Sequence, residues 1–380
     1  MSPRAFAPLV AGALLITPAA HAQTPARTPP FTFSGYAEAY YQWNFNAPAN
    51  GITHLRGFDN RHNSFTLSNL ALEARWDYRD LVGRVALQVG HTPSTYYLGE
   101  PSLPGAPATN ASGPELWKYV QQAYVGYRFG VGRGLTVTAG LFLSPIGPES
   151  IQVREDWNWS RSNLFFGLPF YHAGLRASYP LTDRWTLTAA AYNGWNSVVD
   201  NNDEKSVSLA VTYEVAGRVT ASALYFSGVE RAAGAPEGRA WRHLLDAHVT
   251  WRVTSSLSLL AHANAGFEPN AFGTSAWVAG ALYARLALHR RVFVAVRADA
   301  FYESAASSAS GSAARIFWPV AWVASGTATL DARPHEQVSI RLEYRHDHAA
   351  GPVFFGRDDA QSVPTRDAQD TVTAGMTTWF

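Results

Sequence analysis

The chain of 380 residues contains no cysteine. Disulfides, a lipid-modified N-terminal cysteine and thiolate chemistry at a metal or an active site are therefore all excluded. Lysine is nearly absent too, since only Lys118 and Lys205 occur, and arginine supplies almost all of the positive charge. The formal net charge is +1. A nearly neutral chain has no electrostatic field that would gather nucleic acid, so we expect no nucleic-acid partner.

Long apolar runs are also missing. Beyond the N-terminal region no stretch of about 20 apolar residues occurs, which predicts no transmembrane helix. The N-terminal region has the features of an export signal: Arg4, an apolar run over 5–16, and Ala20 and Ala22 at a small-x-small cleavage site. We expect residues 1–22 to be a cleaved signal peptide and residues 23–30 a Pro-rich periplasmic leader. Removal of Arg4 brings the formal charge to about zero.

What the sequence does contain is aromatic residues and alternating segments. It has 13 Trp, 17 Tyr and 20 Phe. Sixteen segments alternate between apolar and polar residues with a period of two, which is typical of β-strands. They are 31–45, 64–78, 81–93, 115–129, 135–144, 168–180, 185–195, 204–215, 217–228, 241–253, 256–266, 275–288, 291–303, 317–333, 337–346 and 368–380.

The connections between these segments alternate between short and long. The short ones are 79–80, 130–134, 181–184, 216–217, 254–255, 289–290 and 334–336. The long ones are near 46–63, 94–114, 145–167, 196–203, 229–240, 267–274, 304–316 and 347–367. This pattern predicts an all-β fold, a transmembrane up-and-down antiparallel β-barrel over residues 31–380 with about 16 strands, short periplasmic turns and a long third extracellular loop. Fourteen or eighteen strands remain alternatives.

A secreted β-sandwich would show the same alternation, so the positions of the aromatics matter. One set lies on the apolar face near the short turns, and a second set lies at the other strand ends. The first is Trp76, Tyr78, Tyr127, Phe129, Tyr179, Trp185, Tyr213, Trp251 and Phe380, and the second is Trp43, Phe45, Tyr225, Tyr302 and Tyr344. Aromatic rings gather at membrane interfaces, so these sets favour two girdles of a membrane barrel.

The last segment ends on Phe380, which we interpret as an outer-membrane assembly signal read by the barrel-assembly machinery. With the export signal, this predicts location in the cell outer membrane of a Gram-negative bacterium, in contact with its lipid and lipopolysaccharide. The barrel must close, because an open sheet edge in hydrocarbon leaves backbone groups unpaired. A barrel of about 16 to 18 strands leaves an aqueous channel.

The inward faces predict a hydrated lumen in which arginines outnumber carboxylates. Ten inward arginines oppose seven carboxylates in this assignment, which indicates a weakly electropositive channel. The candidate pore-wall residues are Arg75, Arg176, Arg297, Asp299, Arg341, Glu343 and Arg345. We expect replacement of Arg341 and Arg345 with Ser to lower anion selectivity. A register shift of one residue would exchange the two faces of a strand.

Four motifs within residues 144–195 carry a family resemblance. They are Ser144-Pro-Ile-Gly-Pro-Glu-Ser-Ile151, Asn158-Trp-Ser-Arg-Ser162, Pro169-Phe-Tyr-His-Ala-Gly-Leu-Arg176 and Tyr192-Asn-Gly-Trp195. With them the chain resembles a bacterial outer-membrane porin, more narrowly the OmpL-like β-barrel porin family. The resemblance implies a pore and, for porins of this size, a homotrimer. It implies little about the solute, because the solutes of its members are mostly unassigned.

In general porins the third loop folds into the barrel and narrows it, and the resemblance implies the same for residues 145–167. The candidate constriction residues of this loop are Glu149, Arg154, Glu155, Asp156 and Arg161. If the loop folds inward, its carboxylates would face Arg176, Arg297 or Arg341 across a constriction, and the opposed charges would favour small polar or dipolar solutes. The alternative is an external loop whose charges are solvated or paired locally.

Two constellations resemble metal sites, but we interpret both as polar loop residues. His346 and His348 stand two apart at a strand end, and residues 200–204 offer oxygen ligands without the spacing of a calcium-binding loop. We therefore expect no metal and no cofactor. A lipid hydrolase would need Ser and His within hydrogen-bond reach, but His172 and Ser178 of one strand would lie about 20 Å apart. No Gly-x-Ser-x-Gly motif is present.

Together these observations predict a non-enzymatic porin that passes small hydrophilic solutes by diffusion, with a weak preference for anions. A sugar-selective channel is a variant of this prediction. The alternatives from other classes are a non-conducting adhesive or structural barrel and an outer-membrane lipid hydrolase.

Overall fold

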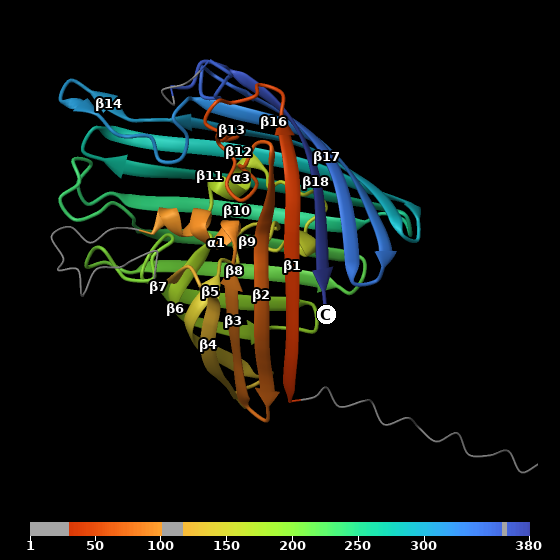
Figure 1. The fold of residues 1–380 in the computed structure, drawn as a ribbon. Helices are drawn as coiled ribbons and strands as arrows, with labels where there is room; N and C mark the ends of the chain where they lie inside the picture. The colour runs from red at the N-terminus through yellow and green to blue at the C-terminus, as the bar shows by residue number, and fades with distance from the viewer. Residues whose placement is uncertain (1–29, 101–116, 359–362) are drawn as a thin grey trace, which may run out of the picture.

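The computed structural model describes residues 30–100, 117–358 and 363–380, so the expected signal peptide and all but the last residue of the leader lie outside the described residues. Sixteen strands form one closed antiparallel barrel (Figure 1). They are β1 (Phe31–Asn44), β2 (Ser64–Tyr78), β3 (Leu81–Val89), β4 (Val120–Phe129), β5 (Leu135–Leu143), β6 (Tyr171–Pro180), β7 (Trp185–Tyr192), β8 (Ser206–Val215), β9 (Val219–Val229), β10 (Trp241–Arg252), β11 (Leu257–Asn270), β12 (Gly273–His289), β13 (Val292–Ser304), β16 (Trp322–His335), β17 (Val338–Ala349) and β18 (Ala368–Trp379). A small hairpin of β14 (Ser307–Ser308) and β15 (Gly311–Ser312) lies apart from the barrel sheet.

The barrel closes by pairing its first strand with its last. β1 runs antiparallel to β18 from Tyr36 opposite Trp379 to Asn44 opposite Thr371. The closure is extended by Gly35 and Phe380, whose backbones exchange hydrogen bonds of 3.3 and 3.1 Å. The ring therefore has no free sheet edge, as a strand-built membrane protein requires.

The two faces of the strands differ as the alternation predicts. On β17 the side chains of Ile340, Leu342 and Tyr344 are about half exposed, whereas Arg341 and Glu343 between them are each 1% exposed. The expected girdle residues Trp185, Trp251 and Phe380 are also exposed on the apolar face. We call the face that carries Arg341 and Glu343 inward and the apolar face outward.

Two loop predictions needed correction. The expected loop at 267–274 is wrong: β11 continues to Asn270 and β12 starts at Gly273, so only two residues connect them. Alternation continues through this stretch, with Phe267 exposed outward and Glu268 buried inward, and the strands pair up to Asn270 opposite Gly273. The second correction concerns the loop before β16. The strand was expected to start at residue 317 but starts at Trp322, because Phe317 and Trp318 of the loop pack into the apolar cluster inside the barrel.

The expected strand 81–93 also ends early, at Val89. Gly90 has a φ of 134°, and a Cβ there would lie 2.6 Å from the Ser68 carbonyl oxygen, so this position needs glycine. The helix α1 (His91–Tyr96) and the 3-10 turn η1 (Tyr97–Gly99) follow. Within the described ranges no helix is long and apolar enough to cross a membrane.

The connection between β5 and β6, residues 144–170, is called the inward segment here. It contains the 3-10 turn η2 (Val153–Glu155) and the short helix α3 (Asn163–Phe166). Its backbone amides donate hydrogen bonds to inward carboxylates of β1, β13 and β17, and its Asn158 side chain donates to Thr329 of β16. It therefore lies within the ring of strands, where Figure 1 shows α3.

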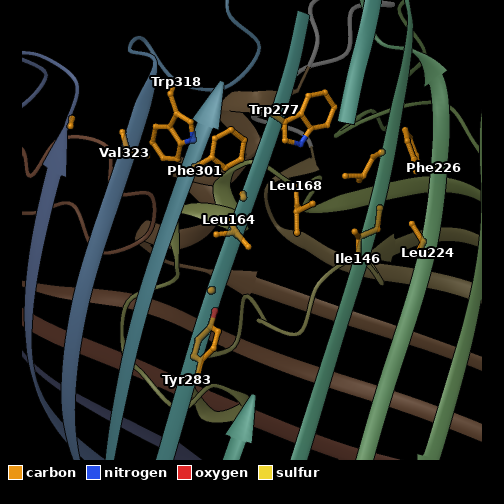
Figure 2. Packing of buried hydrophobic residues seen from close by; sticks show 14 of the residues in the cluster. Ile146, Leu164, Leu168, Leu224, Phe226, Trp277, Tyr283, Phe301, Trp318 and Val323 are labelled. Carbon is orange, nitrogen blue, oxygen red and sulfur yellow. The ribbon is translucent and has the colours of Figure 1, made fainter. Parts of the chain in front are cut away.

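An apolar cluster attaches part of the inward segment to the wall. Leu164 and Leu168 lie beside Trp277 and Phe301 of the wall strands (Figure 2). Gly167 leaves room for the Phe301 ring, since a Cβ there would be 2.3 Å from it. Large apolar side chains thus fill one side of the barrel interior, and the remaining free space must lie elsewhere.

Candidate functional site

Three arginines of the wall are bound by backbone carbonyls of the inward segment. Arg341 donates to the carbonyls of Asn158 (2.8 Å) and Asp156 (2.7 Å). Arg345 donates to Arg161 (2.5 Å) and Arg297 to Ser160 (2.5 Å). Each of the three guanidinium side chains is at most 1% exposed. These three charged groups face inward, and the inward segment covers them.

Carboxylates of the wall also bind the segment, by accepting hydrogen bonds from its amide groups. Glu343 accepts hydrogen bonds from the amides of Trp159 (2.5 Å) and Ser160 (3.0 Å). Asp299 accepts from the backbone amide (2.9 Å) and the side-chain amide (2.8 Å) of Asn163. Several backbone donors and acceptors of the segment are therefore paired with acidic and basic side chains of the wall, an arrangement that gives strong hydrogen bonds.

A further anchor, Glu38 of β1, was not among the expected site residues. It is fully buried, and its carboxylate accepts a 2.7 Å hydrogen bond from the amide of Val153. The sequence did place Glu38 on the inward face. Nothing local indicates its partner, which lies 115 positions away.

The charged residues of the segment are in direct contact with partners and not across an opening from them. Glu149 lies 3.3 Å from Arg297. The carboxylate of Asp156 lies 3.4 Å from Arg161 within the segment, and Arg154 lies 3.8 Å from Glu155. Glu155 is the exception in exposure, since 54% of its side chain is accessible.

Asp156 is the segment residue with the most perturbed titration. Burial raises the pKa of its carboxyl well above the ordinary value, although the neighbouring Arg161 acts in the opposite direction. One of its oxygens accepts a 2.8 Å hydrogen bond from the Ser150 amide. Arg161 is held independently by the carbonyls of Ser150 and Trp159, each at 3.0 Å.

Arg75 and Arg176, the other two expected wall arginines, lie away from these contacts. Arg75 is 2.9 Å from Glu73, with more than half of its side chain exposed. Arg176 lies over the ring of Phe142, 4.6 Å from its centroid. Neither takes part in holding the inward segment.

Free space remains between the inward segment and the wall formed by β3 to β5. This cavity has a volume of about 280 Å³. The wall contributes Arg84, Gln122 and Leu143, and the segment contributes five polar and seven apolar side chains. The polar ones are Ser144, Glu149, Ser150, Gln152 and Glu155, and the apolar ones are Ile146, Pro148, Ile151, Phe165, Leu168, Pro169 and Phe170.

Arg84 is the one wall arginine that lines this cavity among the described residues, and the sequence analysis did not select it as a site residue. It forms an ion pair with Glu73, the neighbouring inward residue of β2. With the Gln122 amide turned so that its oxygen faces the guanidinium, Gln122 accepts from Arg84 at 3.1 and 3.3 Å. These two partners fix the direction of the guanidinium.

Three of the four sequence motifs meet around the ends of the inward segment, whereas the fourth, Asn158–Ser162, contacts the wall strands β13 and β17. Ser144 and His172, one at each end, are joined by a 3.2 Å contact between Oγ and Nε2. The Nδ1 of His172 donates to the carbonyl of Gly194 (3.0 Å), and the ring stacks on Tyr192 at 4.1 Å. Because Nδ1 carries the proton, Nε2 accepts from the serine hydroxyl. The motif residues thus act as a structural junction that fixes where the segment leaves and rejoins the wall.

In the part of the chain that the structure describes, no group of three or more acidic, His or Cys side chains could hold a metal ion. The pair His346 and His348 lies exposed on the outward side of β17, with Asp347 buried on the inward side. Asp347 accepts a hydrogen bond from Arg345 (2.8 Å), and His346 forms a hydrogen bond with Asp370 (2.9 Å).

Comparisons with known proteins agree with this architecture. Residues 30–380 match a family model described as "Putative beta-barrel porin-2, OmpL-like". A search of curated proteins gave no match. The fold is similar to that of an anion-selective porin from Comamonas acidovorans (11% identity, TM-score 0.58). The aligned part covers 92% of this chain and 99% of the porin chain.

Two other solved structures are similar to the same degree. One is OmpT of Vibrio cholerae in a trimer form (8% identity, TM-score 0.56, 92% and 99% coverage). The other is the outer membrane channel DcaP of Acinetobacter baumannii (13% identity, TM-score 0.54, 91% and 96% coverage). At these identities the similarity is one of fold.

Proposed function

The chain belongs to the OmpL-like family of β-barrel porins, and on this premise we propose that it forms a water-filled outer-membrane channel for passive diffusion of small hydrophilic solutes. The observation that carries the proposal is the polar cavity of about 280 Å³ left between the inward segment and β3 to β5 inside a closed barrel. A polar, charge-lined space inside a barrel of this size is occupied by water. The protein needs no cofactor and no catalytic group for this function.

The selectivity of the channel follows from the charges that reach the cavity. The weak anion preference expected from the excess of inward arginines is not carried by Arg297, Arg341 and Arg345, because segment carbonyls surround them. Arg84 and Glu155 are the accessible groups of opposite sign at the cavity, since the second carboxylate of the lining, Glu149, is paired with Arg297. We infer that these two residues set the sign and size of the ion preference.

The proposed surroundings are those of an outer-membrane porin. Phe380 at the end of the closing strand is the proposed signal for the barrel-assembly machinery, and the outward apolar face is the surface for lipid and lipopolysaccharide. A homotrimer is the proposed assembly, supported by the trimer form of the similar OmpT. The signal peptide over residues 1–22 belongs to the same proposal.

One observation favours a second candidate function, a non-conducting adhesive or structural barrel. The apolar cluster around Leu164, Leu168, Trp277 and Phe301 fills one side of the interior. If that filling extended across the whole section, no ion current would pass. The channel proposal instead relies on the cavity beside β3 to β5 remaining open along the barrel.

A planar-bilayer recording of the refolded protein under a salt gradient separates the two candidates. Discrete, long-lived conductance steps are the expected result, and the sign of the reversal potential reports whether Arg84 or Glu155 prevails. A barrel that migrates as folded before heating but gives no conductance would overturn the channel proposal in favour of the non-conducting barrel.

A further inference from the structure

The cavity beside β3 to β5 presents a cation, carboxylates and an apolar surface to the same small volume. Resting on the proposed channel function, we propose that its preferred solutes are small zwitterions of amino-acid size, with the solute carboxylate at Arg84 and the solute ammonium at Glu155.

Arg84 supplies the site for a carboxylate. A guanidinium carries five N–H donors in a planar fork that matches a carboxylate. Its contacts with Glu73 and Gln122 involve only the two terminal nitrogens and take up at most three of those donors. The side chain is 14% exposed, and it lines the cavity. Arg84 is therefore oriented by the wall and retains donors for a solute.

Glu155 supplies the site for an ammonium group. The other carboxylate of the lining, Glu149, is 6% exposed and already engaged by Arg297 (3.3 Å) and by the amide of Ser162 (2.9 Å). Glu155 is 54% exposed, and Arg154 lies 3.8 Å away. An exposed pair at that distance is weak, so the Glu155 carboxylate is accessible to a passing cation.

The apolar part of the lining selects what lies between the two charges. Phe165 and Phe170 have rings stacked 5.2 Å apart, and both line the cavity together with Ile146 and Leu168. A volume of about 280 Å³ corresponds to about nine water molecules at about 30 Å³ each. A small amino acid with an apolar side chain fits that size and both chemical surfaces.

The combination disfavours ions of a single sign. A simple anion is attracted by Arg84 but repelled by the carboxylate of Glu155. A simple cation is attracted by Glu155 but repelled by Arg84. A zwitterion places each of its charges against the opposite one, so the desolvation of both is offset at the same moment. A neutral polyol of equal size gains hydrogen bonds but no charge pairing.

Liposome swelling tests the inference, because zwitterions and polyols both enter without net charge. Liposomes containing the refolded protein are transferred into isosmotic L-valine or isosmotic erythritol, which have equal numbers of non-hydrogen atoms. We expect valine to enter several-fold faster. Arg84→Gln and Glu155→Gln should each bring the ratio of the two rates close to one, whereas the matched controls Arg252→Gln and Glu214→Gln, outside the cavity lining, should leave it unchanged.

The outcomes separate this inference from the channel proposal. Equal entry of valine and erythritol into liposomes with the unaltered protein would overturn the zwitterion preference while leaving the channel intact. A preference that survives in both Arg84→Gln and Glu155→Gln variants would overturn the assigned residues. No swelling in either solute, from protein that migrates as folded before heating, would overturn the channel itself. Because the comparison of solutes uses the unaltered protein, it does not depend on any variant folding.

Discussion

Trp159 of the inward segment occupies the place where Gly375 of β18 would carry a side chain. A Cβ at Gly375 would lie 2.3 Å from the indole ring. Trp159 is completely buried, and its ring centroid is 6.0 Å from that of Tyr40 on β1. The glycine therefore makes a recess in the wall at the seam where the first and last strands pair, and the tryptophan fills it.

Replacing Gly375 with Ala should displace Trp159 and destabilise the folded barrel by about 1–3 kcal/mol, the usual effect of overpacking. The temperature at which heating converts the folded to the unfolded electrophoretic form measures the change. Gly326→Ala is the matched control, because a Cβ at that glycine of β16 meets nothing within 4 Å. Equal transition temperatures for the two variants would mean that the indole does not occupy the recess.

Replacing Arg341 and Arg345 with Ser should alter channel size more than selectivity. Both guanidinium groups hold segment carbonyls, and removing one partner of a buried charged interaction typically costs about 3–5 kcal/mol. We expect a larger, noisier single-channel conductance with a smaller shift in reversal potential than in Arg84→Gln. The expectation from sequence was lower anion selectivity, so a shifted reversal potential at unchanged conductance would favour that earlier interpretation.

The raised pKa of Asp156 predicts a pH dependence. Because the folded protein binds this proton more tightly than the unfolded chain, the contribution of Asp156 to the free energy of unfolding falls as pH rises from the ordinary value of 3.8 through the raised pKa. Asn at this position keeps the acceptor for the Ser150 amide. Asp156→Asn should therefore gain stability over the unaltered protein at neutral pH and lose that advantage near pH 4.

Thermal transitions at the two pH values measure this difference. Asp183→Asn serves as a control, since that carboxylate is 90% exposed in a turn. If the gain from Asp156→Asn is the same at both pH values, the pKa of the carboxyl is not raised by folding and our assignment fails.

The absence of cysteine makes the position of the inward segment directly testable. The side chains of Asn158 and Thr329 are joined by a 2.7 Å hydrogen bond. A protein with Cys at both positions should be cross-linked by a short bifunctional thiol reagent in its folded form, with conductance unchanged. Failure of the folded double variant to cross-link would place the segment elsewhere, and a changed conductance would show that the segment moves during conduction. Asn158→Cys alone is the control for modification without cross-linking.

The barrel was predictable because the alternation of apolar and polar residues along each strand, and the alternation of short and long connections between strands, are both local features of the sequence. Alternation along β13 and β17 assigned Arg297 and Arg341 to the inward face, and both are buried there. The same rule explains the error at 267–274, where a loop was expected. Pro269 nevertheless pairs with Thr274 in the hairpin, because the alternating pattern of Phe267 and Glu268 continues past it.

The site was only partly predictable, because its contacts depend on distance in space and not in sequence. Charge and aromatic content drew attention to residues 145–167. Sequence could not indicate that Arg341 binds carbonyls in place of solute, or that Arg84 reaches the cavity, since both are inward arginines with the same local pattern. A signal for Arg84 does exist in retrospect: Glu73 and Gln122, which lie diagonal to it on the two adjacent strands, are polar residues on the same inward face.

The hydrogen bonds between the inward segment and β17 join residues 182 to 185 positions apart in the chain. Until β16 to β18 have formed, the carbonyls of residues 156–161 lack the wall arginines that bind them, and Trp159 lacks the recess at Gly375. Contacts between residues so far apart in sequence form slowly. Once β1 and β18 have paired, the closed sheet leaves no lateral gap between strands through which the segment could enter the interior. Seating of the segment and closure of the barrel should therefore occur as one cooperative late event in folding, so that a variant defective in one accumulates as an intermediate defective in both.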